Sequence, residues 1–194
     1  MKIAVLSGKG GTGKTTVSTN LSFVNKDIVL IDCDVEEPNA SIFLKPIKSE
    51  EEKVFVEYPV VVQEKCVLCG KCGEICKFNA IIPAKNTVLV FKESCHSCGG
   101  CQLVCPVGAI KYEKREIGKI VKGKTIFNNY MEYGLLNIGE LSGVNIIKTL
   151  KNNVKDIKNY LEIGPGHGLF LKNAIDILDK ETNMTAIDIS PISL

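Results

Sequence analysis

The stretch LSGKGGTGKTT, from Leu6 to Thr16, decides the fold of this chain. It follows an apolar run at residues 3–6, which predicts a buried strand, and it leads into residues 16–23, which predict a helix. A glycine-rich turn between a strand and a helix is typical of a phosphate-binding loop, because glycines let backbone N–H groups approach a polyphosphate beside the positive end of the helix dipole. The candidate nucleotide-binding residues are Gly8, Lys9, Gly10, Gly11, Thr12, Gly13, Lys14, Thr15 and Thr16.

Two side chains of the loop and two downstream carboxylates suit a nucleotide with its metal ion. Lys14 is expected between the β- and γ-phosphates of ATP, and the Thr15 hydroxyl is expected to bind Mg²⁺. A second apolar run at residues 28–31 predicts a strand of a parallel sheet covered on both faces, and it ends in Asp32-Cys33-Asp34. Ligands of α/β sheets bind at the carboxyl ends of the strands, so both aspartates are candidates for this site.

Lys9 narrows the comparison to one group of ATPases. A second lysine inside the loop resembles the deviant-Walker ATPases, which include the MinD and ParA types, the Mrp scaffold ATPases and nitrogenase iron protein. The resemblance implies that Lys9 reaches across a homodimer to the nucleotide of the other subunit, that Asp34 orients the attacking water, and that Asp32 lies near Mg²⁺. Lys9, Lys14 and Asp34 are therefore the candidate catalytic residues. The alternatives are a solvated loop lysine and solvated turn acids.

The composition argues against several classes of partner. The net charge is +2, and only Arg115 among the 24 basic residues is an arginine, which leaves bidentate phosphate or base recognition poorly supplied. We expect no nucleic-acid partner. No apolar stretch reaches the roughly 18 residues of a membrane span, and the first strand shows no signal-peptide pattern, so we expect a cytoplasmic protein without a transmembrane segment. Structural disulfides are uncommon in the cytoplasm, so the nine cysteines indicate metal binding.

Eight of the nine cysteines form an internal repeat with a displacement of 29 residues. The spacing Cys-x2-Cys-x2-Cys-x3-Cys resembles that of bacterial two-cluster ferredoxins, in which the fourth cysteine of each run ligates the other cluster. The resemblance implies one [4Fe–4S] cluster on Cys66, Cys69, Cys72 and Cys105. It implies a second [4Fe–4S] cluster on Cys95, Cys98, Cys101 and Cys76.

Zinc is the competing interpretation of the cysteine runs, and a set of disulfides is a further one. Tetrahedral zinc usually takes two Cys-x2-Cys pairs separated by a longer gap, whereas each run here begins with three cysteines in one Cys-x2-Cys-x2-Cys loop. His96 lies inside the second run and is expected to be solvated or hydrogen-bonded rather than a ligand. The ninth cysteine, Cys33, is expected to pack as a small buried apolar side chain.

The segments around the cysteine repeat predict how the chain leaves the sheet and returns to it. Residues 49–53 form a charged run that predicts a solvated loop, and residues 54–62, which include Pro59, predict an edge strand leading out of the sheet. A strand is expected to return at residues 118–121. A helix is expected after the cap residue Ser142, with an apolar face formed by Val144, Ile147, Leu150 and Val154, and with Ile146 alongside.

The resemblance to the deviant-Walker ATPases ends after that helix. In the family, a tyrosine and apolar residues lead to an aspartate on the Mg²⁺ side, whereas here Tyr160 is followed by Glu162 and then by Gly164. The stretch resembles instead the first motif of class I S-adenosylmethionine methyltransferases, an acidic strand residue followed by Gly-x-Gly-x-Gly, and Asp188 matches their ribose-binding acid. The alternative is that residues 159–189 supply a β-α-β unit to the same sheet.

Together these patterns predict an α/β fold, a P-loop NTPase parallel sheet with an inserted α+β ferredoxin-like domain. The expected segments are an ATPase core at 1–57, a 2[4Fe–4S] insert at 58–116, a second part of the core at 117–156 and a divergent β-α-β tail at 157–194. The favoured function is that of an ATP-binding iron–sulfur protein that couples its nucleotide state to electron transfer or to cluster and partner handling. The redox partner is expected to be a protein that the sequence does not identify. The alternatives are a ferredoxin-type electron carrier with an inactive ATPase half, and a fragment of a fusion with a SAM-dependent methyltransferase.

Overall fold

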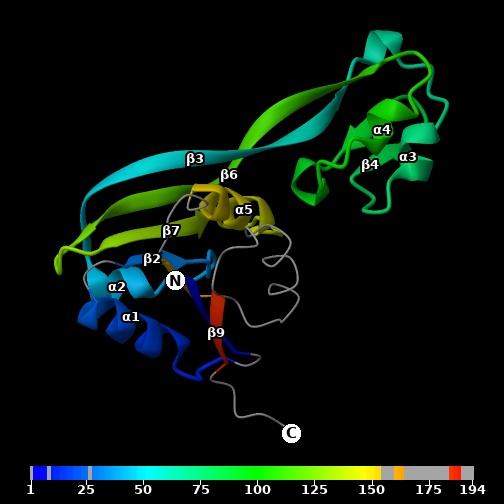
Figure 1. The fold of residues 1–194 in the computed structure, drawn as a ribbon. Coiled ribbons are helices and arrows are strands. Elements are labelled where there is room, and N and C mark those ends of the chain that lie inside the picture. Colours follow the sequence, from blue (N-terminus) through cyan, green and yellow to red (C-terminus); the bar gives the residue numbers. More distant parts are fainter. Residues whose placement is uncertain (1, 8–9, 26–27, 154–159, 164–183, 189–194) are drawn as a thin grey trace, which may run out of the picture. The chain divides into compact units, whose positions relative to one another are not determined.

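The computed structural model describes residues 2–7, 10–25, 28–153, 160–163 and 184–188 (Figure 1). The chain divides into two compact units, and it passes between them within two long strands, β3 (Pro46–Val61) and β6 (Ile110–Thr125). The first unit comprises Met1–Val54, Gly118–Leu136 and Gly143–Leu194, and the second comprises Phe55–Ile117 and Asn137–Ser142.

In the described part of the chain, seven strands form one sheet in the order β3-β6-β7-β2-β8-β1-β9. β1 pairs in parallel with β8 and β9, β2 pairs in parallel with β8 and β7, and β6 runs antiparallel to β7. The apolar runs predicted at residues 3–6 and 28–31 therefore form parallel strands of one sheet, with β8 between them, as expected for strands buried on both faces. The strands besides β3 and β6 are β1 (Lys2–Leu6), β2 (Val29–Asp32), β7 (Tyr130–Leu136), β8 (Tyr160–Ile163) and β9 (Met184–Asp188).

Two helices pack against one set of strand side chains. They are α1 (Lys14–Val24) and α2 (Ala40–Leu44), and a core joins α2 to Val5, Leu30 and Met131 of three strands of the sheet. The half-buried Val17 and Leu21 of α1 pack against the same core. None of the described helices is long and apolar enough to cross a membrane.

The third helix of the first unit, α5 (Val144–Asn153), packs against β7 and β6 (Figure 1). Ile146 and Leu150 are fully buried, whereas Val144 is 52% exposed, so the buried stripe is rotated from the predicted one. The reason is a close approach to glycine, since a Cβ on Gly134 would meet the Ile146 side chain at 2.5 Å and Leu150 at 3.3 Å.

The charged run at residues 49–53 belongs to β3, so the predicted loop was wrong. β3 is the terminal strand of the sheet, which confirms the edge position expected from Pro59. Charged side chains are typical of exposed edge strands, and here they pair with lysines of the neighbouring strand β6. Lys119 Nζ lies 2.8 Å from Glu51 Oε1, and Lys122 Nζ lies 2.7 Å from Glu52 Oε2.

The second unit repeats its own structure along the chain. Its first half contains the 3₁₀ helix η1 (Gln63–Lys65), α3 (Lys71–Ile75) and β4 (Ile81–Pro83). Its second half contains η2 (Lys92–Ser94), α4 (Gly100–Leu103) and the start of β6, and β5 (Val88–Val90) pairs antiparallel with β4. The internal repeat of the sequence is therefore also a repeat of secondary structure.

Backbone geometry repeats with the same displacement of 29 residues. Leu68 and Ser97 both have a φ of 54° although neither is glycine. The Val62 N–H donates to the Ala109 carbonyl at 2.7 Å, and the Phe91 N–H donates to the Ala80 carbonyl at 2.8 Å. Because each of these bonds joins one half to the other, the two halves hold each other in place.

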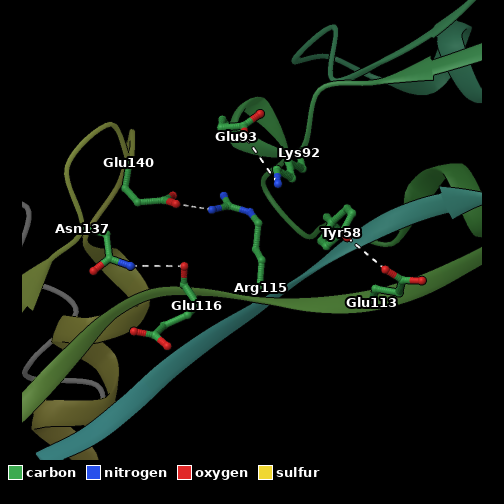
Figure 2. A network of polar contacts seen from close by, with 8 residues as sticks. All are labelled: Tyr58, Lys92, Glu93, Glu113, Arg115, Glu116, Asn137 and Glu140. Atoms are coloured by element: carbon green, nitrogen blue, oxygen red, sulfur yellow. Dashed lines mark hydrogen bonds and ion pairs between the residues drawn. The ribbon is translucent and has the colours of Figure 1, made fainter.

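The segment Asn137–Ser142 belongs to the second unit, although the sequence assigned it to the ATPase core at 117–156. Figure 2 shows the Arg115 side chain pointing from β6 to the Glu140 carboxylate, with which it forms a largely buried ion pair. Asn137 adds backbone and side-chain hydrogen bonds to the Ile117 and Glu116 carbonyls, at 2.9 and 3.4 Å. These contacts explain why the segment groups with β6 residues of this unit.

Candidate functional site

The glycine-rich loop follows β1 and leads directly into α1. Gly13 is the N-cap of α1 with a φ of 91°, and Gly11 has a φ of 73°, both in the left-handed region that glycine favours. A Cβ on Gly10, Gly11 or Gly13 would meet nothing within 4 Å, so this part of the loop borders open space. No side chain of the described residues caps α1, whose first N–H groups are therefore suited to an anion.

Polar side chains of the loop converge on Ser7. Lys14 Nζ donates to Ser7 Oγ at 2.9 Å, and Thr12 Oγ1 donates to the same oxygen at 2.7 Å. Thr15 is half-buried in the first turn of α1, and Thr16 beside it is exposed. Gly8 and Lys9 lie outside the described residues, so the role expected for Lys9 stays a prediction.

Asp32 ends β2 and is almost completely buried. Its two oxygens accept the backbone N–H groups of Asp34 and Ala40, each at 3.1 Å, and so fix the turn between β2 and α2. Burial raises the pKa of Asp32 to about 6 against the effect of these hydrogen bonds. Asp34 is half-buried, and its carboxylate accepts the Glu37 N–H at 3.4 Å. The Mg²⁺ and water-orienting roles of the two aspartates stay predictions.

A cavity in the second unit is lined by four cysteines with apolar neighbours. Three come from the first run and one from the end of the second. The four are those that the resemblance to two-cluster ferredoxins assigns to one cluster: Cys66, Cys69, Cys72 and Cys105.

A second cavity lies within the same unit and is lined by the complementary set of four cysteines. Three of its cysteines come from the second run and one from the end of the first: Cys95, Cys98, Cys101 and Cys76. His96 also lines this cavity and stacks on Phe78, with ring centroids 3.7 Å apart. The repeat thus brings all eight cysteines around two cavities.

Backbone N–H groups point at the cysteine sulfurs. The Ala80 N–H donates to Cys76 Sγ at 3.3 Å, and the Ala109 N–H donates to Cys105 Sγ at 3.2 Å, at corresponding points of the repeat. Burial acts to raise the pKa of Cys105, but the N–H groups of residues 107–110 outweigh it and lower the pKa. Burial raises the pKa of Cys72 and Cys95. The fourth cysteine of the second run is thus the thiol most disposed to ionise among these three.

All nine cysteines are thiols rather than disulfides in the structure, and Cys33 is fully buried, as predicted. Among the described residues, no group of three or more Cys, His, Asp or Glu side chains is placed to hold a single metal ion. The four thiols of each set instead surround a cavity.

Tyr112 lines the second cavity and was not singled out from the sequence. Its hydroxyl lies 3.2 Å from Cys101 Sγ and shares a hydrogen bond with it. Burial, followed by this hydrogen bond, raises the pKa of Tyr112 well above its ordinary value. The sequence signal for this contact is slight, because the residue stands at the repeat position of Pro83, which is unlike it.

A mostly parallel sheet whose strand β1 runs into a glycine-rich loop and a helix without a side-chain cap defines a P-loop nucleotide-binding protein. Over residues 3–187, the sequence matches the family described as CobQ/CobB/MinD/ParA nucleotide binding domain. The chain belongs to this family, which confirms the resemblance carried by the loop.

Several curated proteins are similar to this chain. The uncharacterized protein MJ0578 of Methanocaldococcus jannaschii is 38% identical over 185 residues, which cover 92% of this chain and 65% of that protein. MJ0579 of the same organism is 33% identical over 157 residues, or 78% and 55% of the two chains. An iron-sulfur cluster carrier protein of Pyrococcus abyssi is 38% identical over 60 residues, or 29% and 19%. The chain therefore spans less than two thirds of the length of each of these relatives.

The family match also covers most of the segment that resembles a methyltransferase motif. β8 and β9 from this segment lie on either side of β1 in the sheet, in parallel with it. They therefore complete the sheet of the nucleotide-binding domain, as the β-α-β alternative expects. Residues 164–183 lie outside the described part of the chain, and SAM binding stays a prediction.

Proposed function

We propose that this chain is an ATP-binding iron–sulfur protein that holds two [4Fe–4S] clusters and couples its nucleotide state to electron transfer or to cluster and partner handling. One observation carries the proposal. Each of two cavities is lined by four thiols, three from one cysteine run and the fourth from the other. This crossed arrangement is that of two-cluster ferredoxins, so the second unit corresponds to a ferredoxin-like insert near residues 58–116.

The residues around the cavities suit such clusters. Cys66, Cys69, Cys72 and Cys105 would hold the first cluster, and Cys76, Cys95, Cys98 and Cys101 the second. Backbone N–H groups at Cys76 and Cys105 would stabilise thiolate charge, and the apolar core of Ile81, Val88 and Ile110 lies beside the thiols. When bound, the clusters would supply one-electron transfer, which no side chain here provides.

The nucleotide part of the proposal rests on the P-loop and on family membership. Lys14 and Thr15 stand at the start of α1 where they would contact ATP and Mg²⁺, with Asp34 orienting water and Asp32 near the metal. We further propose a homodimer in which Lys9 contacts the nucleotide of the other subunit, and a cytoplasmic location in which the thiols stay reduced. The similarity to iron-sulfur cluster carrier proteins supports a role in cluster handling.

Iron content and spectrum test the cluster part. Anaerobically purified protein should contain about eight irons and matching sulfide per chain, with broad visible absorption that dithionite bleaches. Stoichiometric zinc without iron would overturn the proposal in favour of the zinc interpretation.

Single substitutions test the crossed ligand sets. Cys76→Ser should damage the cluster of the second run, and Cys105→Ser should damage that of the first, leaving about four irons in each variant. Cys33→Ala is the matched control, because Cys33 is buried and lines neither cavity, so the variant should leave the iron content unchanged. Loss of iron from the variant's own run would show that the fourth ligands do not cross over.

The second candidate function is an electron carrier with an inactive ATPase half. It is favoured by the glycine at position 164, where the resemblance to the deviant-Walker ATPases implies an aspartate. ATP binding measured with and without hydrolysis separates the two functions. Binding with turnover that responds to the cluster redox state supports the coupled protein, whereas loaded clusters in a chain that does not hydrolyse ATP support the carrier.

A further inference from the structure

We propose that the two clusters have different reduction potentials, and that Tyr112 is the positioning residue that raises the potential of the second by hydrogen bonding to Cys101. The inference rests on the proposed function and deepens it, because it assigns an order in which the two clusters accept electrons.

The contact is specific to one half of the repeat. Tyr112 is the third residue of β6, and its hydroxyl lies 3.2 Å from the sulfur of Cys101, a buried cysteine of the second cavity. The corresponding pair in the first half is Pro83 and Cys72, each 29 residues earlier. A proline side chain carries no hydrogen-bond donor, so the first half cannot form this bond.

A second pair of corresponding residues, Gly73 and Gln102, also differs between the two halves, next to Pro83 and to the start of β6. A Cβ on Gly73 would collide with the ring of Pro83, so glycine makes room for the proline in the first half. The corresponding residue of the second half is Gln102, whose Nε2 donates to the Ile110 carbonyl at 3.2 Å. In that half the Gln102 side chain is hydrogen-bonded to the start of β6, and the Tyr112 hydroxyl contacts Cys101 Sγ.

The hydrogen bond acts on the potential through charge. A cluster becomes more negative on reduction, and part of that charge lies on its cysteine sulfurs. A donor at a sulfur therefore stabilises the reduced form more than the oxidised form, which raises the potential. The second cluster should be the first to accept an electron and the last to lose it.

Tyr112→Phe tests this in the full chain with its clusters loaded anaerobically. In a spectroscopic redox titration, one of the two transitions should move to a more negative potential. We expect the equilibrium constant for reduction of that cluster to fall about threefold, which corresponds to about 30 mV for one electron. The iron content and the other transition should not change. Tyr58→Phe is the matched control, because the Tyr58 hydroxyl bonds to Glu113 instead, at 3.0 Å (Figure 2).

The cysteine variants assign the shifted transition. In the Cys105→Ser background, which retains the second cluster, Tyr112→Phe should shift the remaining transition, and in the Cys76→Ser background it should not. Equal shifts of both transitions, or no shift in a fully loaded protein, would overturn this inference and leave the proposed function standing. A chain that takes up no iron would overturn both.

Discussion

At the scale of single residues, two carboxyl groups that are buried among the described residues of the first unit make its stability depend on pH. Asp32 is one, and Glu132 of β7 is the other, buried beside Asn153, whose Nδ2 donates to it at 3.4 Å. Burial raises the pKa of Glu132 against the opposing effects of Asn153 and Lys122. The folded state thus holds this proton more tightly than the unfolded chain does, so protonation stabilises the fold.

Glu132→Gln should therefore stabilise the protein at neutral pH and matter less in acid. The stabilising contribution of the Glu132 proton is complete below the ordinary glutamate pKa and is lost as pH rises through the raised one. We expect the variant to exceed the wild type by on the order of 1 kcal/mol at about pH 7.5, with the difference vanishing near pH 4.5. Thermal unfolding at both pH values measures it.

The control for this prediction is Glu51→Gln, which removes an exposed carboxylate from β3. It should leave the pH dependence of stability unchanged, because exposed pairs contribute little. Asp32, whose pKa is about 6, titrates in the wild type and in both variants, so only the differences between them are informative. A Glu132→Gln difference of equal size at both pH values would contradict the argument.

Residue positions were predicted well where the contacts involved follow a repeated sequence pattern, and poorly where they depend on how separate elements fold together. The resemblance to two-cluster ferredoxins grouped eight thiols in two crossed sets, and the two cavities group them in the same way. Cluster ligation itself stays a proposal. The partners of Asp32 and Tyr112 could not be predicted. Both depend on backbone and side chains that only the turn after β2 and the start of β6 bring into reach.

At the scale of elements, apolar runs predicted strands well and helix faces less well. β1, β2 and α1 lie within a few residues of their predicted bounds. The run at residues 49–53 was misjudged because charge on an edge strand resembles charge in a loop. For α5, the apolar periodicity predicted the helix itself. Which of its apolar residues are buried is decided by the glycines of β6 and β7 against which the helix packs.

Substitutions in α5 distinguish the observed face from the predicted one. Ile146→Ala should lower the free energy of unfolding by about 2–5 kcal/mol, because it leaves a cavity against Gly118 and Gly134. Val144→Ala, the matched control at an exposed position of the same helix, should cost less than about 0.5 kcal/mol. Denaturant unfolding measures both. Equal costs would restore the face predicted from the sequence.

At the scale of the whole molecule, the nucleotide-binding domain includes strands that follow the cysteine repeat in the sequence. The match reaches residue 187, and β8 pairs with both β1 and β2, so a strand that comes after the repeat lies beside the P-loop strand. The sequence alone left this segment between two interpretations, because the glycine motif after β8 resembles that of another enzyme class. Strand pairing, which is a property of the complete sheet, supports the nucleotide-binding one.

If this chain hydrolyses ATP, as proposed above, we expect the rate to depend on the residue immediately after β8. The resemblance puts an acid of the Mg²⁺ shell at position 164, where this chain has glycine, and β8 ends at Ile163. Glu162 stands two residues earlier, about 6.6 Å along the strand. In P-loop enzymes the metal neutralises charge on the β- and γ-oxygens as the bond breaks, and a missing group of this kind costs roughly 10²- to 10³-fold.

We therefore expect this chain to bind ATP with Mg²⁺ and to hydrolyse it slowly, and Gly164→Asp to raise turnover by about 10²-fold. Gly164→Asn is the matched control, because it adds similar bulk without the charge and should not increase the rate. Lys14→Ala should abolish the activity by weakening ATP binding, and so gives the background. Steady-state phosphate release measures all four proteins. If the unmodified chain already turns over at about 1 s⁻¹ or faster, then Glu162 or Asp32 already serves the metal, and the glycine after β8 costs the enzyme nothing.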